Sequence, residues 1–279
     1  MKKIGFIDHY LDEWHANNYP DMIKKVAGDE LVVAYAYAEI NSPKGGMTTD
    51  QWCEKFGVQR INTIEELVEK SDCLIVLSPD NPERHLDLTR LPLASGKCTY
   101  VDKTFATTKA IAEEIVANAE KHNTPFFSTS ALRFANEMKN IRKDGVTFIN
   151  SKGPGVFEIY TIHQLEPIVM LMGSQAERVM AIGSKEAPAL LIEFAGNRRA
   201  VLSLFNDWRV SFGLNIAYDD GKFEVIGDMT SYFDNFIVEM CDFFKTGNVK
   251  ADPKETIAIM GIIESGAKAM KKPLEWVNI

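Results

Sequence analysis

Short apolar runs alternate with helix-periodic stretches through the first 125 residues of the chain. The apolar runs, each flanked by polar or turn-forming residues, lie at 4–7, 31–36, 73–77, 98–101 and 125–128. The stretches between them carry apolar residues at helical spacing, at about 12–27, 48–56, 63–70, 83–95 and 107–122. Alternating strands and helices are typical of βαβ units, so residues 1–125 are predicted to form a mainly parallel α/β sheet.

The pattern changes in the second half of the chain. A helical stretch near 134–143 precedes a strand-forming run at 156–162 and a helix at 164–172, where Pro167 would fit the first turn. Further strand-like runs follow at 178–182, 189–194, 199–204, 212–218 and 222–226, and helices are expected at 230–245 and 254–270. Turn residues separate neighbouring runs at 196–197 and 219–221. Residues 126–279 are therefore predicted to form a second, α+β domain with a mainly antiparallel sheet.

A lysine directly follows one of the predicted strands. Asp102 and Lys103 come after the run 98–101, and Ser78 and Pro79 come after the run 73–77. Ligands of parallel α/β sheets collect at the carboxyl ends of the strands, so we expect both pairs to face one crevice. Lys103 is thus a candidate site residue, and the alternative is a surface lysine at a strand end.

Composition and charge exclude several classes of protein. The chain has 279 residues, of which 46% are hydrophobic, and a net charge of −8 at pH 7. Such a chain can bury a core but offers no basic footprint for nucleic acid. The four cysteines form no C-x-x-C pair, the apolar run 4–7 is too short for a secretion signal, and no run could span a membrane. We therefore expect a cytoplasmic protein with neither nucleic-acid nor membrane partners.

Two spaced motifs resemble those of a known enzyme family. Gly96-Lys97 is followed after four residues by Asp102-Lys103-Thr104, and His85 lies eleven residues before Gly96. Further on, His163 and Glu166 precede an apolar helix that ends in glycine. With the predicted domains, this arrangement resembles the glucose-fructose oxidoreductase / inositol dehydrogenase / rhizopine catabolism (Gfo/Idh/MocA) family. The family has Glu-Lys-Pro at residues 102–104, and an Asp where this chain has Ile159.

The resemblance implies a fold and an activity. Residues 1–125 would form a Rossmann-like, doubly wound dinucleotide-binding domain, and residues 126–279 a domain for substrate binding and oligomerisation. The protein would transfer hydride between NAD or NADP and a sugar, a polyol or a related small hydroxyl or carbonyl compound, as a homodimer or homotetramer. Lys103 and His163 would be catalytic, since a lysine can stabilise charge on the reacting oxygen and a histidine can exchange its proton.

The resemblance also assigns binding residues. The cofactor would be contacted by residues after the predicted strands, namely Ile7, Asp8, His9, Tyr10, Ser78, Pro79, Asp80, His85 and Asp102. Arg133 and Glu166 would face the substrate. For three of these residues another reading stays open: His85 could pack or cap its helix, His163 could be a core histidine, and Arg133 could form a surface salt bridge.

The first strand departs from the family's pattern. A dinucleotide site needs G-x-G-x-x-G there, so that the backbone can approach the pyrophosphate, but residues 5–15 read GFIDHYLDEWH. Asp8, Asp12 and Glu13 would repel a pyrophosphate. The last two could instead complement the dipole of a helix as acids in its first turn. The missing glycines motivate an alternative function, a non-catalytic protein that senses a metabolite or serves as an assembly subunit.

The acid that binds the adenosine ribose is also displaced. The second predicted strand has no acid until Glu39, which could take that role, and Ser42 with Lys44 could hold a 2′-phosphate instead. The choice between NAD and NADP stays open. A rival reading makes Asp8, His9, Glu13 and His15 a metal site, because imidazoles and carboxylates are suitable ligands. The spacing matches no known metal motif, so no metal is expected.

Overall fold

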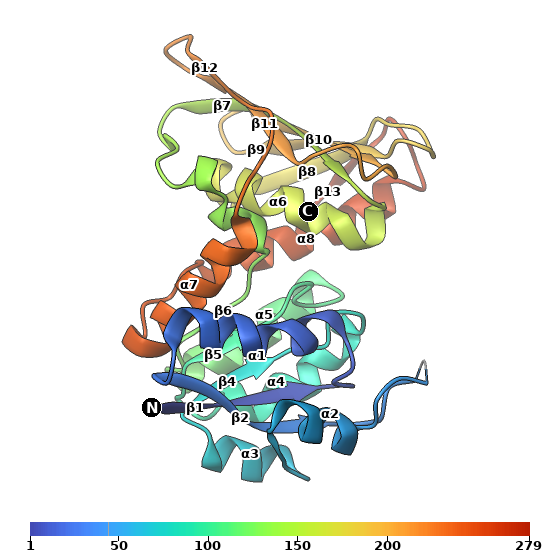
Figure 1. Cartoon of the computed structure of the whole chain (residues 1–279). Coiled ribbons are helices and arrows are strands. Elements are labelled where there is room, and N and C mark those ends of the chain that lie inside the picture. Colours follow the sequence, from blue (N-terminus) through green and yellow to red (C-terminus); the bar gives the residue numbers. More distant parts are fainter. Residues whose placement is uncertain (44) are drawn as a thin grey trace. The chain divides into compact units, whose positions relative to one another are not determined.

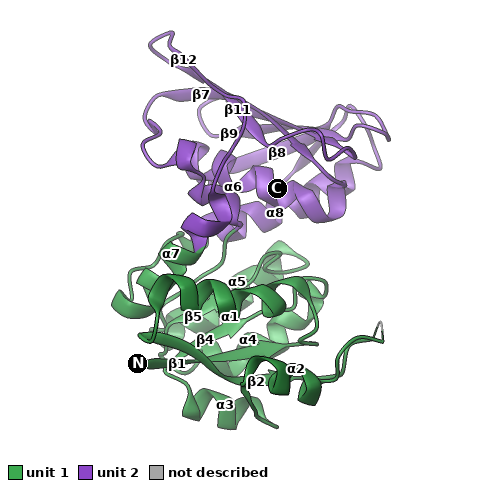
Figure 2. Ribbon diagram, in the orientation of Figure 1, with its two compact units in different colours: residues 1–129, 237–253 green, residues 130–236, 254–279 purple. Residues whose placement is uncertain are grey.

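The computed structural model describes residues 1–43 and 45–279. Lys44, the candidate for a 2′-phosphate, lies outside the described residues. The chain forms two compact units: unit 1 contains residues 1–129 and 237–253, and unit 2 contains residues 130–236 and 254–279 (Figure 2). Unit 1 is thus made of two segments of the chain, because the chain returns to it late in the sequence. In the returning segment, Phe243 packs edge-to-face on Phe127, with ring centroids 5.0 Å apart.

Unit 1 has a fully parallel sheet of six strands in the order β3-β2-β1-β4-β5-β6. The strands are β1 (Lys2–Asp8), β2 (Leu31–Ala38), β3 (Gln59–Arg60), β4 (Cys73–Val76), β5 (Thr99–Val101) and β6 (Phe126–Phe127). All four residues of β4 are buried, as expected of a strand that is covered on both faces. The strand order reverses between β1 and β4, which is the ligand-binding point of such sheets. The predicted Rossmann-like sheet is confirmed.

In the described part of unit 1, five α-helices connect these strands. They are α1 (Trp14–Ala27), α2 (Thr49–Phe56), α3 (Ile64–Lys70), α4 (His85–Leu93) and α5 (Lys109–Lys121), with a 3-10 turn η1 (Pro82–Arg84) before α4. Helices cover both faces of the sheet, with α1 and α3 on opposite sides (Figure 1). Gly5 allows α3 to approach β1 closely, since a Cβ at this position would lie 2.5 Å from a methyl carbon of Leu67.

Unit 2 has a seven-stranded sheet in the order β12-β11-β7-β10-β9-β8-β13. The strands are β7 (Val146–Pro154), β8 (Ala176–Ala181), β9 (Ala189–Phe194), β10 (Arg198–Phe205), β11 (Gly213–Tyr218), β12 (Phe223–Ile226) and β13 (Trp276–Asn278). Neighbouring strands are antiparallel except β7 and β10, which are parallel. The sheet is thus mixed and mainly antiparallel, as predicted.

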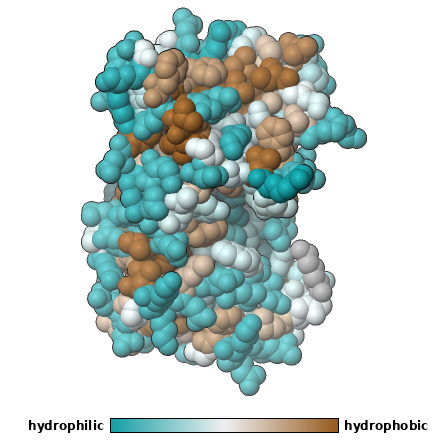
Figure 3. Space-filling model, turned by 45° about the horizontal axis from the view of Figure 1, so that its top comes forward, coloured by the Kyte–Doolittle hydropathy of each residue, from teal (hydrophilic) through white to brown (hydrophobic). Residues whose placement is uncertain are grey.

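Helices cover one face of this second sheet. The helices are α6 (Phe157–Met172) and α8 (Pro253–Ala269), which lie together under the sheet (Figure 1). Helix α7 (Tyr232–Thr246) begins in unit 2, but most of it belongs to unit 1. Along β10 the residues Ala200, Leu202 and Leu204 are fully buried, whereas the alternate positions are partly or fully exposed. The other face therefore stays open. Figure 3 shows separate hydrophobic patches on an otherwise mostly hydrophilic surface.

Two predictions for the start of unit 2 were wrong. The run 156–162, read as a strand, belongs to helix α6, and the stretch near 134–143 contains only the 3-10 turns η2 (Ala131–Phe134) and η3 (Asn136–Met138). Strand β7 was missed. Helix α6 is buried over most of its surface, so apolar residues occur all round it and conceal the helical period. Pro167 lies well inside this helix and not in its first turn.

Candidate functional site

The polar residues of unit 1 gather where β1, β4 and β5 end. These strands are neighbours in a parallel sheet, so the residues that follow them lie at one edge. Asp8 is the last residue of β1, and Asp102 and Lys103 directly follow β5. Asp8 and Asp102 are each 1% exposed, and the side chain of Lys103 is 16% exposed.

Asp8 is a buried carboxyl group with one unsatisfied oxygen. Its Oδ1 accepts a long hydrogen bond of 3.4 Å from the backbone N–H of Tyr10. Its Oδ2 has no hydrogen-bond partner among the described residues. Burial, and then the nearby charge of Glu13, raise the pKa of Asp8 well above its usual value. The neutral, protonated form of Asp8 is therefore favoured.

Glu13 caps the helix that follows β1. Its Oε2 accepts the backbone N–H of His15 at 2.7 Å, and its Oε1 accepts the N–H of Ala16. These amides belong to the first turn of α1, where a helix exposes unpaired donors and the positive end of its dipole. The sequence predicted Glu13 inside the first turn, whereas the structure makes it the N-cap. Glu13 thus supplies the negative charge at this helix end.

His15 links this cap to the end of β5. Its Nδ1 lies 2.9 Å from Oε2 of Glu13, and its Nε2 lies 3.9 Å from Oδ2 of Asp102. The same Oδ2 lies 3.4 Å from Nζ of Lys103, and Tyr100 donates its hydroxyl to Oδ1 at 3.0 Å. Burial alone would raise the pKa of Asp102, but the nearby cations and the Tyr100 hydrogen bond lower it below its usual value. Asp102 is therefore an ionised group beside Lys103.

Other predicted cofactor residues are held by contacts within the protein. Tyr10 donates its hydroxyl to Oδ2 of Asp80 at 2.8 Å, joining the segments after β1 and β4. Burial, and then Asp80, raise the pKa of Tyr10. The hydroxyl of Ser78 donates to the carbonyl of Asn81 at 3.0 Å. Ile7 is fully buried and Pro79 is half-buried beside them.

His85 is enclosed by the main chain. It is fully buried, and its ring nitrogens lie 2.5 Å and 3.0 Å from the carbonyl oxygens of Leu77 and Phe105. Burial lowers the pKa of His85 despite these acceptors. These contacts join the end of β4 to the segment after Lys103, which favours the structural reading of His85.

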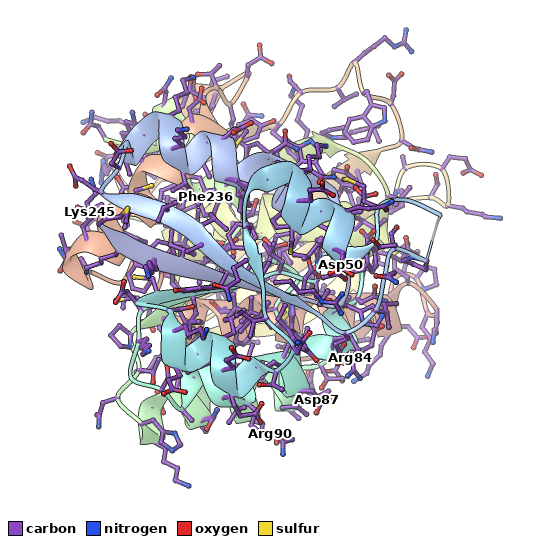
Figure 4. The ribbon with its side chains drawn as sticks, turned by 60° about the horizontal axis from the view of Figure 1, so that its bottom comes forward. Asp50, Arg84, Asp87, Arg90, Phe236 and Lys245 are labelled. Atoms are coloured by element: carbon purple, nitrogen blue, oxygen red, sulfur yellow. The ribbon has the colours of Figure 1, made fainter. Side chains whose placement is uncertain are left out.

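Glu39 follows directly after β2, where the ribose-binding acid of a dinucleotide site is expected. It is already paired, since Arg84 donates to it at 2.6 Å and 2.9 Å and His9 lies 2.8 Å away. Hydrogen bonds from Arg84 lower the pKa of Glu39. Arg84 lies on the same surface stretch as Asp87 and Arg90 of α4 and is 3.4 Å from Asp87 (Figure 4). The acid is therefore present but held in an ion-pair cluster.

The junction between β1 and α1 does not fit a pyrophosphate in the usual dinucleotide pose. The amides that would bind the phosphate oxygens donate to Glu13. The second buried acid, Asp8, lies close enough for Glu13 to raise its pKa. None of the fingerprint glycines is present between Asp8 and His15 to let a phosphate approach the backbone.

His163, the histidine predicted to be catalytic, lies in unit 2 on α6. Its Nδ1 is 2.7 Å from Oγ of Ser130, a residue that sequence reasoning did not single out. The rings of Tyr160 and Phe212 flank His163 at centroid distances of 5.3 Å and 5.9 Å. Ile159, which replaces the family's Asp, is 58% exposed one helical turn earlier. The ring of His163 is thus positioned by a hydroxyl group and two aromatic side chains.

Arg133 and Glu166 are paired with each other in unit 2. Nε of Arg133 lies 3.0 Å from Glu166, and its Nη2 lies 2.6 Å from Glu255. Arg133 is only 7% exposed, and its two carboxylates outweigh the effect of burial and raise its pKa. Arg133 does form salt bridges, but its guanidinium group is buried and not on the surface as the alternative reading expected. Its partners lie far away in the sequence, so no local signal pointed to them.

The histidines of the alternative metal site, His9 and His15, do not lie beside a common set of carboxylates. His9 lies beside Glu39, whereas His15 lies beside Glu13. Within the described ranges 1–43 and 45–279, no three His, Cys, Asp or Glu side chains are arranged to hold a metal ion. In the same ranges, no helix has the length and apolar character needed to cross a membrane.

The parallel sheet with its switch point and the second, helix-covered sheet define the class of fold, a two-unit α/β protein with a Rossmann-like first unit. Solved structures with this fold match nearly the whole chain. A protein assigned as a myo-inositol dehydrogenase from Sinorhizobium meliloti is 12% identical, with a TM-score of 0.74 and 100% coverage of both chains. The resemblance to the Gfo/Idh/MocA family is thus confirmed at the level of the fold.

Two further structures give the same result. An NAD-binding oxidoreductase from Klebsiella pneumoniae is 13% identical, with a TM-score of 0.75 and coverage of 100% of this chain and 98% of that one. An oxidoreductase from Agrobacterium radiobacter, solved with NAD+, L-tartaric acid and magnesium, is 12% identical, with a TM-score of 0.73 and coverage of 99% and 98%. No family model and no curated protein matches the sequence. At these identities the likeness concerns the fold.

Proposed function

We propose that the protein is an oxidoreductase that uses NAD or NADP to interconvert hydroxyl and carbonyl groups on a sugar, a polyol or a related small compound. The shared fold supports this function, since similar structures include oxidoreductases that bind NAD. The observation that carries it is Lys103, which follows β5 directly and has its ammonium group 3.4 Å from the buried carboxylate of Asp102. A cofactor would have to be held without the usual contacts to the start of α1, because Glu13 uses them.

Lys103 and His163 are the proposed catalytic residues. The ammonium group of Lys103 lies 3.4 Å from Asp102, and it can donate a hydrogen bond to the reacting oxygen and stabilise negative charge on it. Ser130 orients the imidazole of His163, which can take up or release the proton of a hydroxyl group. Arg133 and Glu166, the residues proposed to face the substrate, would act as a neutralised pair.

Two measurements test this function. Titration of the purified protein with NADH and NADPH, followed by fluorescence, is expected to show binding of at least one of them below the millimolar range. The Lys103→Met variant is expected to lose turnover by about 10²–10³-fold, as on removal of one charge-stabilising donor, while cofactor affinity is kept. Lys121→Met, at the exposed end of α5, is the matched control. Absence of binding of both nucleotides contradicts the proposed function, and unchanged turnover removes Lys103 from it.

The protein is further proposed to be cytoplasmic and to form a homodimer or homotetramer, without nucleic-acid or membrane partners. All four cysteines are free, which suits a reducing compartment. Unit 2 exposes Phe223 and Val225 by 78% and 75%, apolar surface that a second copy could cover. Sedimentation velocity is expected to give a dimer or tetramer, and a monomer at all concentrations contradicts self-association.

Glu13 and Asp8 favour a second candidate function. A protein that keeps the fold but only senses a metabolite or serves as an assembly subunit would tolerate a carboxylate in the place of the pyrophosphate. This candidate predicts a stable protein that binds a small ligand without redox chemistry. Reproducible nicotinamide-dependent oxidation of any alcohol would reject it.

A further inference from the structure

We infer that Glu13 is an internal anion that takes the place of a diphosphate at the start of α1, and that it makes unit 1 select against ligands that carry a diphosphate. The inference concerns ligand binding by unit 1 and does not require turnover. If the proposed function is correct, NAD or NADP is held mainly through its nucleoside parts.

The contacts of Glu13 are those that a bound phosphate group would make. Its two oxygens accept the backbone N–H groups of His15 and Ala16, and its side chain is only 5% exposed. Helix N-termini bind phosphates through these same first-turn amides and through the helix dipole. A diphosphate could reach the amides of α1 only after the Glu13 carboxylate had left them.

His15 holds the carboxylate in place from a second direction. Its backbone N–H and its Nδ1 both approach Oε2 of Glu13, at 2.7 Å and 2.9 Å. The other side of the ring faces Asp102, with Nε2 3.9 Å from Oδ2. Movement of Glu13 away from the helix would therefore also disturb the contacts of His15. The cap is a fixed part of unit 1.

Asp8 provides a second, independent indication. It is 1% exposed, and its Oδ2 has no hydrogen-bond partner among residues 1–43 and 45–279. A bound diphosphate would add negative charge next to a buried acid that already resists ionisation. A hydroxyl or amide group of a neutral ligand could instead satisfy this oxygen. Glu13 thus disfavours an anion at this end of the sheet, whereas the neutral Asp8 supplies no positive charge to attract one and leaves an oxygen for contact with an uncharged group.

The test compares two probes that differ only in the diphosphate group, ADP and adenosine, by calorimetric titration of the protein. The Glu13→Ser variant removes the charge and keeps a good N-cap residue. Glu13→Asp keeps both the charge and the cap and is the matched control. The wild-type protein is expected to bind ADP no more tightly than adenosine. Glu13→Ser should tighten ADP binding by about tenfold or more, the effect of gaining charge-assisted hydrogen bonds, and leave adenosine unchanged.

Several outcomes overturn the inference. One is wild-type protein that already binds ADP much more tightly than adenosine. Another is folded Glu13→Ser protein, verified by circular dichroism, whose affinity for ADP is unchanged or undetectable. A third is equal tightening by Glu13→Asp, which would assign the effect to the shape of the residue and not to its charge. These outcomes leave the proposed function standing if NADH or NADPH binds, whereas failure of both nucleotides to bind removes that function alone.

Discussion

Nε2 of His15 lies 3.9 Å from Oδ2 of Asp102, although the two residues are 87 positions apart in the sequence. His15 follows the end of β1 closely and Asp102 follows β5 directly, so the contact joins two segments at the carboxyl ends of the sheet. The same Oδ2 of Asp102 lies 3.4 Å from Nζ of Lys103, one of the two proposed catalytic residues. Substitutions at the start of α1 are therefore expected to alter the surroundings of Lys103 through Asp102.

The His15→Gln variant is expected to remove the favourable electrostatic interaction between His15 and the Asp102 carboxylate. His15 is the leading charge that lowers the pKa of this carboxyl group, so its removal should raise that pKa towards or above the usual value. NMR titration of the Asp102 carboxyl carbon checks the shift. Replacement of the exposed His122, which follows α5, is the control and should leave Asp102 unchanged. An unshifted Asp102 in His15→Gln would show that the contact at 3.9 Å carries little energy.

Asp8 should make the protein less stable as the pH rises. Its folded-state pKa is raised, so the native state holds the proton more tightly than the unfolded state does. Stability from this group is full below about pH 4, the ordinary pKa of Asp, and is lost as the pH rises towards the raised pKa.

Asp8→Asn replaces the ionisable group by a neutral one of similar shape. It is expected to raise the free energy of unfolding at pH 7 by on the order of 1 kcal/mol or more and to flatten the pH dependence above pH 4. Urea unfolding from pH 5 to pH 8 measures both effects. A variant that is less stable than the wild type across this range would contradict a neutral Asp8.

Arg133→Met tests whether the Arg133 ion pairs are a buried structural unit. Removing the cation leaves Glu166 buried without its charge partner, at a cost of about 3–5 kcal/mol of unfolding free energy. Arg142→Met, which breaks exposed ion pairs with Asp219 and Asp220, is the matched control and should change stability little. Equal losses in the two variants would argue against the buried pair.

Ser130 is expected to act as a positioning residue for His163. Ser130→Ala removes the contact at 2.7 Å, so turnover should fall by about tenfold and its pH profile should shift, because the imidazole loses its orienting partner. Ser130→Thr keeps the hydroxyl group and should restore much of the loss. Ser184→Ala, in an exposed turn, serves as the control. A pH profile that stays unchanged while turnover falls would limit Ser130 to a structural role.

Gly5→Ala is expected to separate β1 from α3. The added Cβ would lie 2.5 Å from Cδ2 of Leu67 and still closer to Oγ of Ser71, so overpacking should cost about 1–3 kcal/mol. Gly227→Ala, where nothing lies within 4 Å of the added atom, is the control. Thermal unfolding of both variants distinguishes them, and equal melting temperatures would mean that α3 can shift freely.

The first half of the fold was predictable because local signals there agree with the tertiary structure. Apolar runs and capping residues such as Thr48, Thr63 and Thr108 mark the strands and helix starts of unit 1 closely. In unit 2, helix α6 is buried over most of its surface, which weakens its helical period, and only its second half, residues 164–172, was predicted as a helix. Strand β7 has polar residues at several exposed positions and ends next to glycines, so its sequence resembles a loop.

The sequence predicted where the candidate site residues lie in the sheet, but not which groups they contact. The order of strands places Lys103 and Asp102 at the ligand edge, which follows from pattern and topology alone. The partners of Glu13 are backbone amides, which every residue has, so the sequence could not distinguish an N-cap from an acid in the first turn. Glu255 lies 122 residues from Arg133, and no local rule predicts a contact at that separation.

The Glu13 cap also bears on the protein in the absence of ligand. A helix N-terminus whose amides bind the phosphate of a nucleotide is stabilised by that binding. Its stability therefore rises and falls with the concentration of the nucleotide. A carboxylate of the same chain is present once in every molecule and cannot be diluted or depleted. The start of α1 is therefore expected to keep its structure in cells rich or poor in nucleotide, which separates the folding of unit 1 from the metabolic state of its host.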